Sequence, residues 1–153
     1  MKPPLGFGKD VNKYLNHYVN VADTKAAGTL TASLALAGYL ITTRPAESWP
    51  LLFHWIALLL LLTSGTMALL TIYPRTPKIG SSVIFWEDIR SRSLDVYLKD
   101  LGQVDEVEVE RQYGAQNHLI SGVLQNKYNA VQQAMRALIG SLIAVILKLL
   151  TGA

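Results

Sequence analysis

Catalytic chemistry needs nucleophiles, acids or metal ligands at close and regular spacing, and this sequence offers few of them. The chain contains no cysteine, which excludes disulfides, thiolate metal sites and cysteine nucleophiles. Its histidines, His17, His54 and His118, lie in three separate segments and form no metal-binding pair. The sequence also contains neither a glycine-rich phosphate loop nor a serine-hydrolase motif. We therefore expect neither an enzyme nor a metal site.

A different chemistry, the binding of a small organic anion, fits the polar part of the chain. Aromatic stacking beside a cation suits a nucleotide base and its phosphate. The basic residues considered for this role are Arg90, Arg92, Arg111, His118 and Lys127, and the aromatic residues are Trp86, Tyr97, Tyr113 and Tyr128. The alternative is that these rings pack between helices as ordinary core residues.

Two more ionisable residues, Asp23 and Lys25, stand where an apolar run begins. A charged group at membrane depth is a functional candidate by default, and anchoring at the membrane surface is the alternative. Two positions apart on a helix, the two side chains face different directions. Each of them therefore needs its own partner.

The composition predicts a small membrane protein. Half of the 153 residues are hydrophobic, only 16% are charged, and the mean hydropathy is +0.25, whereas an ordinary soluble domain has roughly a quarter charged residues. The formal net charge is +3, but residues 75–136 hold eight basic and eight acidic side chains. A protein that binds a nucleic-acid polymer would concentrate basic charge in that region. We expect no such partner.

Three apolar blocks predict the membrane segments. Residues 51–72 carry no formal charge over about 22 positions, which is long enough to cross a bilayer core. Residues 26–43 are rich in small side chains, which favours packing against other helices. Residues 137–150 are short for a span and contain Lys148, so we predict a transmembrane or membrane-inserted helix.

The residues outside the three apolar blocks are also predicted to be helical. A stripe of apolar residues from Val11 runs directly into the first span. We predict a second helix over 82–101, capped by Ser81 or Ser82 and ended by Gly102. The acidic residues at 105–110 favour the start of a last helix that runs unbroken to about Thr151. Its coiled-coil-like seam, a candidate partner-binding face, is Ile120, Leu124, Tyr128, Val131, Met135 and Leu138.

Together these elements predict an all-α membrane protein. It has two N-terminal transmembrane helices, a cytoplasmic helical hairpin, and a C-terminal apolar helix segment continuous with the last cytoplasmic helix. The excess of Lys and Arg flanking the spans places the N-terminus and residues 74–136 in the cytoplasm. The predicted parts are an amphipathic cytoplasmic lead at 1–25, a transmembrane hairpin at 26–73, a cytoplasmic sensor region at 74–136 and a third membrane segment at 137–153.

Several short motifs give the chain a family resemblance over roughly residues 10–136. The segment Ala22-Asp23-Thr24-Lys25-Ala26 resembles the A-D-x-K-A motif of the Pycsar transmembrane effector family. Phe85-Trp86-Glu87-Asp88-Ile89, followed by Tyr97-Leu98, is also similar, as is the proline after the second span, Pro74. The last helix carries Gln116, Leu119, Lys127-Tyr128 and Ala134, similar to the family pattern Q-x-x-x-L…K-Y…A.

The resemblance implies a bacterial antiphage effector of the inner membrane. A partner pyrimidine cyclase would make cyclic CMP or cyclic UMP, and the effector would respond by impairing the membrane and stopping the host cell. Such an effector would bind its messenger through the cytoplasmic helices, with no cofactor, and we expect it to act as a homo-oligomer in the lipid bilayer. From the residues themselves we take the nucleotide-binding candidates to be Lys25, Arg90, Tyr97, Lys127 and Tyr128.

Two other functions stay open at this point. One is a constitutive small carrier or channel, with Asp23 and Lys25 as its pathway charges. The other is an accessory membrane subunit whose seam binds a partner's helix.

Overall fold

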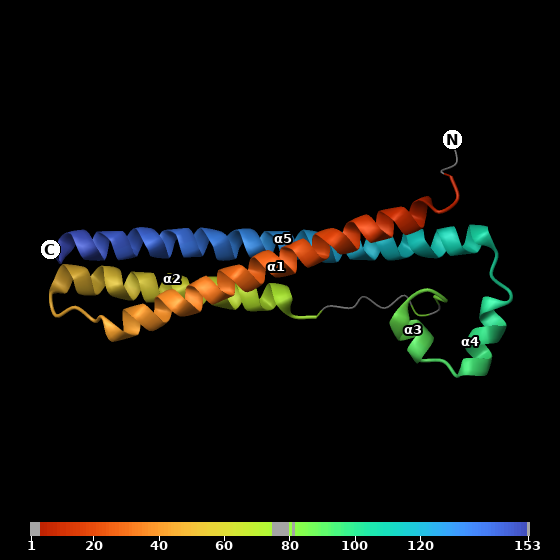
Figure 1. Cartoon of the computed structure of the whole chain (residues 1–153), viewed down its shortest axis with the longest axis horizontal. Coiled ribbons are helices and arrows are strands. Elements are labelled where there is room, and N and C mark those ends of the chain that lie inside the picture. The colour runs from red at the N-terminus through yellow and green to blue at the C-terminus, as the bar shows by residue number, and fades with distance from the viewer. Residues whose placement is uncertain (1–3, 75–79, 81, 153) are drawn as a thin grey trace. The chain divides into compact units, whose positions relative to one another are not determined.

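The computed structural model describes residues 4–74, 80 and 82–152, and within these residues it contains helices and no strand. Figure 1 shows the helices in chain order. They are α1 (Phe7–Thr42), α2 (Ser48–Ile72), α3 (Trp86–Arg90), α4 (Leu94–Leu101) and α5 (Glu106–Thr151). The predicted all-α fold is confirmed.

Two helices, α1 and α5, are much longer than α3 and α4, and the sequence predicted that each would run without a break. The 36 residues of α1 join the polar N-terminal stripe to the first apolar block without a break. The 46 residues of α5 run from the acidic segment to Thr151, and Asp105 caps its start by accepting a hydrogen bond from the Glu108 amide at 2.7 Å. At 1.5 Å per residue, α5 is about 70 Å long.

The chain divides into two compact units. The first unit contains residues 1–20 and 74–125, and the second contains residues 21–73 and 126–153. The long helices α1 and α5 contribute residues to both units, whereas α2 belongs to the second and α3 and α4 to the first.

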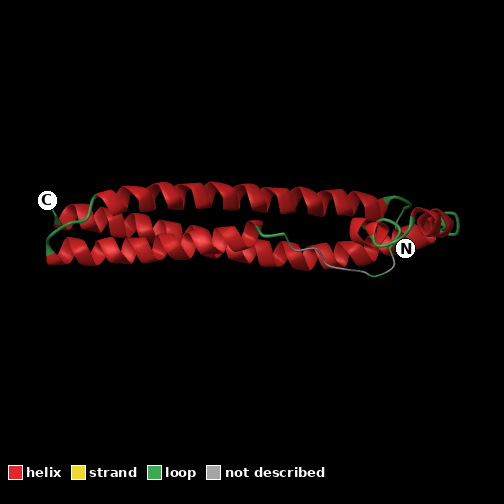
Figure 2. Cartoon of the chain, turned by 90° about the horizontal axis from the view of Figure 1, so that it is seen from below, coloured by secondary structure: helices red, strands yellow, loops and turns green. Residues whose placement is uncertain are grey.

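The second unit packs its three helices with the period of a coiled coil. At the end marked C, Figure 2 shows the three helices of this unit side by side. Steps of four and three residues separate the buried positions of α2, which are Pro50, His54, Ala57, Leu61, Ser64, Ala68 and Thr71. This alternation gives the mean period of 3.5 that keeps one seam of a helix against its neighbours. Most of these side chains are small, so the helix backbones approach closely.

The interior seam of α5 differs from the predicted one. Val131 and Ile120 are buried as expected, but Met135 is 42% exposed. In the second unit the interior positions are instead Lys127, Val131, Ala134, Ser141, Ala144 and Lys148. Because Lys127 and Ser141 hold interior positions, a search for apolar residues alone selects the neighbouring face. Part of the predicted partner-binding seam is therefore already used within the chain, since Val131 and Tyr128 pack against Ala22, Ala26 and Ala68.

The predicted helix over 82–101 is wrong in one respect, because it consists of two short helices, α3 and α4. The Ser91 hydroxyl donates to the Asp88 carbonyl at 2.8 Å, and the Ser93 hydroxyl accepts from the Val96 amide. Serine hydroxyls that bond to nearby backbone compete with the helical ladder and favour caps. Ser93 therefore caps α4, whereas α3 follows Phe85 without a side-chain cap. Ser82 caps neither helix, and Ser81 lies outside the described residues. Gly102 ends α4 as predicted.

Two of the described helices, α2 and α5, are long and apolar enough to cross a membrane. The first apolar block, which forms the second half of α1, stays a predicted span. The sidedness of the chain and the boundaries predicted from it also stay predictions.

Candidate functional site

The second unit contains a buried ion pair between residues that the sequence singled out. The Lys127 ammonium on α5 donates to the Asp23 carboxylate on α1 and, at 2.6 Å, to the Thr71 carbonyl on α2. Lys127 is 5% exposed. Thr71 lies in the last turn of α2, where carbonyl groups lack a helical donor and the helix dipole favours a cation. One ammonium group thus joins all three helices of this unit.

Lys25 has a different partner, as the spacing of the two residues required. Its ammonium lies 5.8 Å from the centroid of the Tyr128 ring, within the range of a cation–π contact. The two motif segments therefore meet pair by pair, Asp23 with Lys127 and Lys25 with Tyr128.

Two further polar contacts of the second unit were missed from the sequence. The Ser33 hydroxyl donates to Ser64 at 2.9 Å, and Ser64 donates to the Ala134 carbonyl at 2.8 Å, again joining α1, α2 and α5. Lys148 donates to the carbonyl and hydroxyl of Thr43 at 2.7 and 3.1 Å. A regular spacing along α5 could have indicated these contacts. Successive members of the set Lys127, Ala134, Ser141 and Lys148 are seven residues apart, so they lie on one face of the helix.

The first unit contains a polar groove with a volume of about 470 Å³. Ligand pockets in proteins typically have volumes of about 300–1,000 Å³. Its lining residues are Gly80, Val83, Arg92, Asp100, Gln103, Val104, Glu108 and Gln112. The Arg92 guanidinium, whose side chain is 15% exposed, donates to the Asp100 carboxylate at 3.2 Å. The groove thus combines a mostly buried cation with amide and carboxylate groups.

Hydrogen bonds to side chains hold the walls of this groove. The Gln112 side-chain oxygen accepts from the Val83 amide at 2.9 Å and from the Ser82 hydroxyl at 3.1 Å. The Asp88 carboxylate accepts from the amides of Gly80 and Ser82 at 3.1 and 3.0 Å. Tyr97 donates its hydroxyl to the Val83 carbonyl at 3.4 Å. The segment before α3 is therefore tied to α5 and α4 through its backbone.

One acid that lines the groove, Glu108, has a strongly lowered pKa. Hydrogen bonds from Arg111 and then from Gln112 lower the pKa of Glu108 from its usual 4.5 to about 2. The same contact raises the pKa of Arg111. Glu108 therefore stays charged at every physiological pH, and its acceptor atoms hold Gln112 in place at 3.0 Å.

The five nucleotide-binding candidates divide between the two units. Arg90 and Tyr97 belong to the first unit, and Lys25, Lys127 and Tyr128 belong to the second. Arg90 is exposed at the end of α3, and Tyr97 is half-buried on α4. Their role in nucleotide binding stays a prediction.

Trp86 contradicts the core-packing alternative, because its side chain is 60% exposed while those of Val83 and Phe85 are buried. The chain is extended at Phe85, and α3 begins only at Trp86. Consecutive side chains of extended backbone point to opposite sides, so burying Phe85 turns Trp86 outward.

The comparison with known proteins decides the family. Residues 8–152 match the family described as the Pycsar effector protein domain. The chain belongs to the Pycsar effector family. A curated relative, the Pycsar effector protein SaPycTM of Staphylococcus aureus, is 24% identical over 123 residues, which cover 78% of each chain. No solved structure matches this Pycsar effector chain.

Membership makes the protein an antiphage membrane effector of a family that is not an enzyme class. The family match also extends the resemblance seen in the motifs. It includes residues 137–152, the last apolar block, which the motif positions had left out.

Proposed function

We propose that this Pycsar effector binds cyclic CMP or cyclic UMP in its first unit and responds by impairing the bacterial inner membrane, which arrests or kills the host cell. A partner pyrimidine cyclase supplies the messenger. The observation that carries the proposal is the unbroken helix α5, which runs from the groove of the first unit into the apolar second unit.

The groove in the first unit supports a messenger of this chemical class. A cyclic mononucleotide carries one negative charge, and a charge-assisted hydrogen bond from arginine is its natural anchor. Arg92 lies within the groove, and Arg90 is exposed nearby in sequence at the end of α3. The phosphate would replace the Asp100 carboxylate as the acceptor for Arg92.

The base would contact the side chains that face the same groove. Gln103 presents an amide that can both donate and accept, as pairing with the edge of a pyrimidine requires. Tyr97 on α4 does not line the groove itself, but its hydroxyl bonds to the lining residue Val83, which makes it the aromatic candidate beside the groove. Lys127 has its ammonium engaged by Asp23 and Thr71, which supports a structural role for that residue.

Binding can change the membrane helices only if the messenger prefers one arrangement of the chain. Replacing Asp100 at Arg92 loosens the end of α4 from the segment around α3. The start of α5 lines the same groove through Glu108 and Gln112, so a shift there is transmitted along a single helix.

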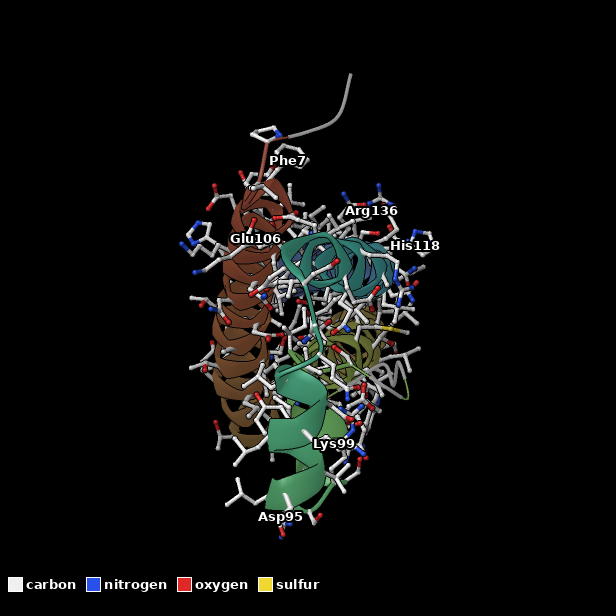
Figure 3. All side chains as sticks on the ribbon, turned by 90° about the vertical axis from the view of Figure 1, so that its right-hand side faces the viewer. Phe7, Asp95, Lys99, Glu106, His118 and Arg136 are labelled. Atoms are coloured by element: carbon white, nitrogen blue, oxygen red, sulfur yellow. The ribbon has the colours of Figure 1, made fainter. Side chains whose placement is uncertain are left out.

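The test measures binding of cyclic CMP and cyclic UMP to the full-length protein in nanodiscs, and depolarisation of cells that express it. Removing a charge-assisted hydrogen bond costs about 1.5–3 kcal/mol, so Arg92→Ala should weaken binding by about 10- to 100-fold. Lys99→Ala is the matched control, because Lys99 is an exposed cation on α4 (Figure 3).

Asp100→Asn separates the proposed role of Arg92 from a purely structural one. It removes the carboxylate that competes for Arg92, so binding should be kept or become tighter. Loss of binding in both variants would instead indicate that the ion pair only maintains the fold. If neither nucleotide binds the wild-type protein or depolarises cells, the proposed function is wrong, and a current without any messenger would favour the constitutive channel.

A further inference from the structure

The interior of the second unit is polar at three separate levels, each of which includes α2, α5 and either α1 or the residue that follows it. The first level is Asp23, Thr71 and Lys127, joined by the ion pair described above. The second level is Ser33, Ser64 and the carbonyl of Ala134. The third level is Thr43, His54 and Lys148, where Lys148 bonds to Thr43 and is one of the cations near His54.

Helix packing alone does not account for the ionisable groups of these levels. Hydroxyl groups such as Ser33 and Ser64 commonly hold membrane helices together. By contrast, Lys127, Lys148 and His54 are 5%, 6% and 2% exposed, and ionisable groups inside a membrane bundle are costly. Within the described residues, the Nδ1 atom of the buried His54 has no hydrogen-bond partner. A ring nitrogen without a partner adds nothing to helix packing.

A mostly apolar layer separates the second and third levels, and the hydroxyl of the buried Ser141 at this height of α5 donates to the Leu138 carbonyl of its own helix. The layer contains the buried residues Leu40, Ala57, Leu61 and Ala144. Leu36, Leu58 and Leu138 pack around them. A tight ring of apolar side chains excludes water and ions, and such constrictions gate channels by dewetting. The interior is therefore closed in this structure, although it is polar on both sides of the closure.

The contact between α1 and α2 is incompletely filled. A groove of about 350 Å³ lies between α1 and α2, and Ser33 and Leu61 are among its lining residues. Leu61 belongs to the apolar layer and Ser33 to the second polar level. The groove thus leaves room for α1 and α2 to move at the level of Ser33 and Leu61.

From these observations we propose that the interior of the second unit is the ion path of this effector, with Leu40 and Leu61 as its gate. This inference rests on the proposed function and specifies its last step, since the membrane is impaired by a gated path and not by general disruption of the lipid. Separation of α1 from α2 wets the apolar layer and connects the three polar levels. The lining carries two ammonium groups and one carboxylate, so it favours small anions such as chloride over potassium.

Cysteine accessibility tests the path directly, because the chain has no cysteine of its own. Ser64→Cys places a thiol of similar size in the buried second level, and Thr63→Cys places one at the adjacent, exposed position of α2. Both thiols lie at nearly the same depth. The protein is reconstituted in phosphatidylethanolamine–phosphatidylglycerol vesicles and treated with a water-soluble methanethiosulfonate, with and without cyclic CMP or cyclic UMP.

The messenger should accelerate modification of Ser64→Cys on the order of tenfold or more, because only a hydrated thiol ionises and reacts. Modification should also reduce the chloride current. Thr63→Cys should stay unreactive in both conditions, since it faces lipid. Leu61→Cys, with Leu62→Cys as its exposed neighbour, repeats the comparison at the gate if Ser64→Cys fails to insert.

Three results would overturn the ion path while leaving messenger binding intact. They are a messenger-triggered leak with no change in the reactivity of Ser64→Cys and Leu61→Cys, equal acceleration at Thr63→Cys and Ser64→Cys, and release of large dextrans together with ions. A current that prefers potassium contradicts the proposed lining. If cyclic CMP and cyclic UMP produce no leak in the wild-type vesicles, the proposed function fails first, and the path fails with it.

Discussion

The interiors of the two units are built in different ways. The second unit buries small and polar side chains at regular coiled-coil positions on three long helices. The first unit has little apolar interior, and none of the residues of α4 is buried. Large apolar side chains of α4 instead face outward, and they are Leu94, Val96, Leu98 and Leu101.

The two units are therefore stabilised by different kinds of interaction. The second unit is specified by helix period and by contacts that join all three helices. The first unit depends on individual hydrogen bonds that the side chains of Asp88, Glu110 and Gln112 accept from backbone amides. Regions with few buried apolar contacts open at low free-energy cost. A unit of that kind suits a sensor, whereas a closely packed bundle suits a gate.

The largest expected effect comes from the buried ion pair of the second unit. Asp23→Ala leaves the ammonium of Lys127 almost fully buried without its counter-charge. Breaking a fully buried pair costs about 3–5 kcal/mol. Because the Asp23 side chain is 35% exposed and Thr71 still accepts a hydrogen bond, we expect the free energy of unfolding to fall by about 2–3 kcal/mol. Thermal unfolding of the protein in detergent measures this change.

Two controls sharpen that prediction. Replacing both partners, Asp23→Leu with Lys127→Met, removes both charges and should restore most of the stability. Lys25→Met removes an exposed cation that contacts only one face of Tyr128, so its cost should stay below about 1 kcal/mol. Equal losses for Asp23→Ala and Lys25→Met would show that the pair does not hold the second unit together.

A smaller effect is expected where α1 meets α5 in the first unit. Gly8 is buried there, and a Cβ at this position would lie 2.7 Å from both the Glu110 carboxylate and the Tyr113 Cβ. Glu110 also accepts hydrogen bonds from the amides of Gly6 and Gly8. Forcing a methyl group into such a contact costs about 1–3 kcal/mol. Gly8→Ala should therefore accelerate amide hydrogen exchange near the start of α1 and of α5, while exchange in the second unit stays unchanged.

Gly122→Ala is the matched variant, because a Cβ there meets nothing within 4 Å. Alanine is the better helix former by about 0.5–1 kcal/mol, so exchange in α5 should slow down. If Gly8→Ala also accelerates exchange in the second unit, or leaves exchange in the first unit unchanged, the two units do not differ as described.

The sequence predicted the long elements of the fold because their signals extend over many residues. The stripe that begins at Val11 and the acidic start of α5 each indicated a helix that the structure confirms. The short segment around Ser91 and Ser93 gave no such signal. There, the hydroxyl-to-backbone contacts of two residues outweigh the apolar pattern and divide one predicted helix into α3 and α4.

The candidate site could be predicted only in part. The need of Asp23 and Lys25 for separate partners followed from helix geometry, and the structure supplies Lys127 and Tyr128. The polar contacts Ser33–Ser64 and Lys148–Thr43 did not follow, because apolar periodicity gives no weight to serine, threonine or lysine at interior positions. The Arg92–Asp100 pair joins residues eight apart across a helix break, so it becomes visible only once that break is known.

The smallest expected effect is a dependence of local hydrogen exchange on pH, confined to the first unit. The pKa of Glu108 is lowered to about 2 in the folded chain, from a usual value of 4.5, first by its hydrogen bond to Arg111. A group with a lowered pKa stabilises the fold fully above its unfolded value, and this contribution disappears as the pH falls toward the folded value. Acidification from pH 4.5 to about 2 should therefore loosen the start of α5.

The pair is exposed, and exposed ion pairs contribute little to stability, so the effect should appear as local hydrogen exchange near Gln112 and not as global unfolding. Glu108→Gln removes the titrating group and should abolish the dependence on pH in this window. Arg111→Gln should bring the pKa of Glu108 back toward its usual value, as an NMR titration of the carboxyl carbon would measure. Gln112 bonds both to Glu108 and to the backbone of Val83. If hydrogen exchange at Val83 also changes with pH, the charge on Glu108 stabilises the wall of the groove. A response that stops at the first turn of α5 would limit Glu108 to stabilising the start of that helix.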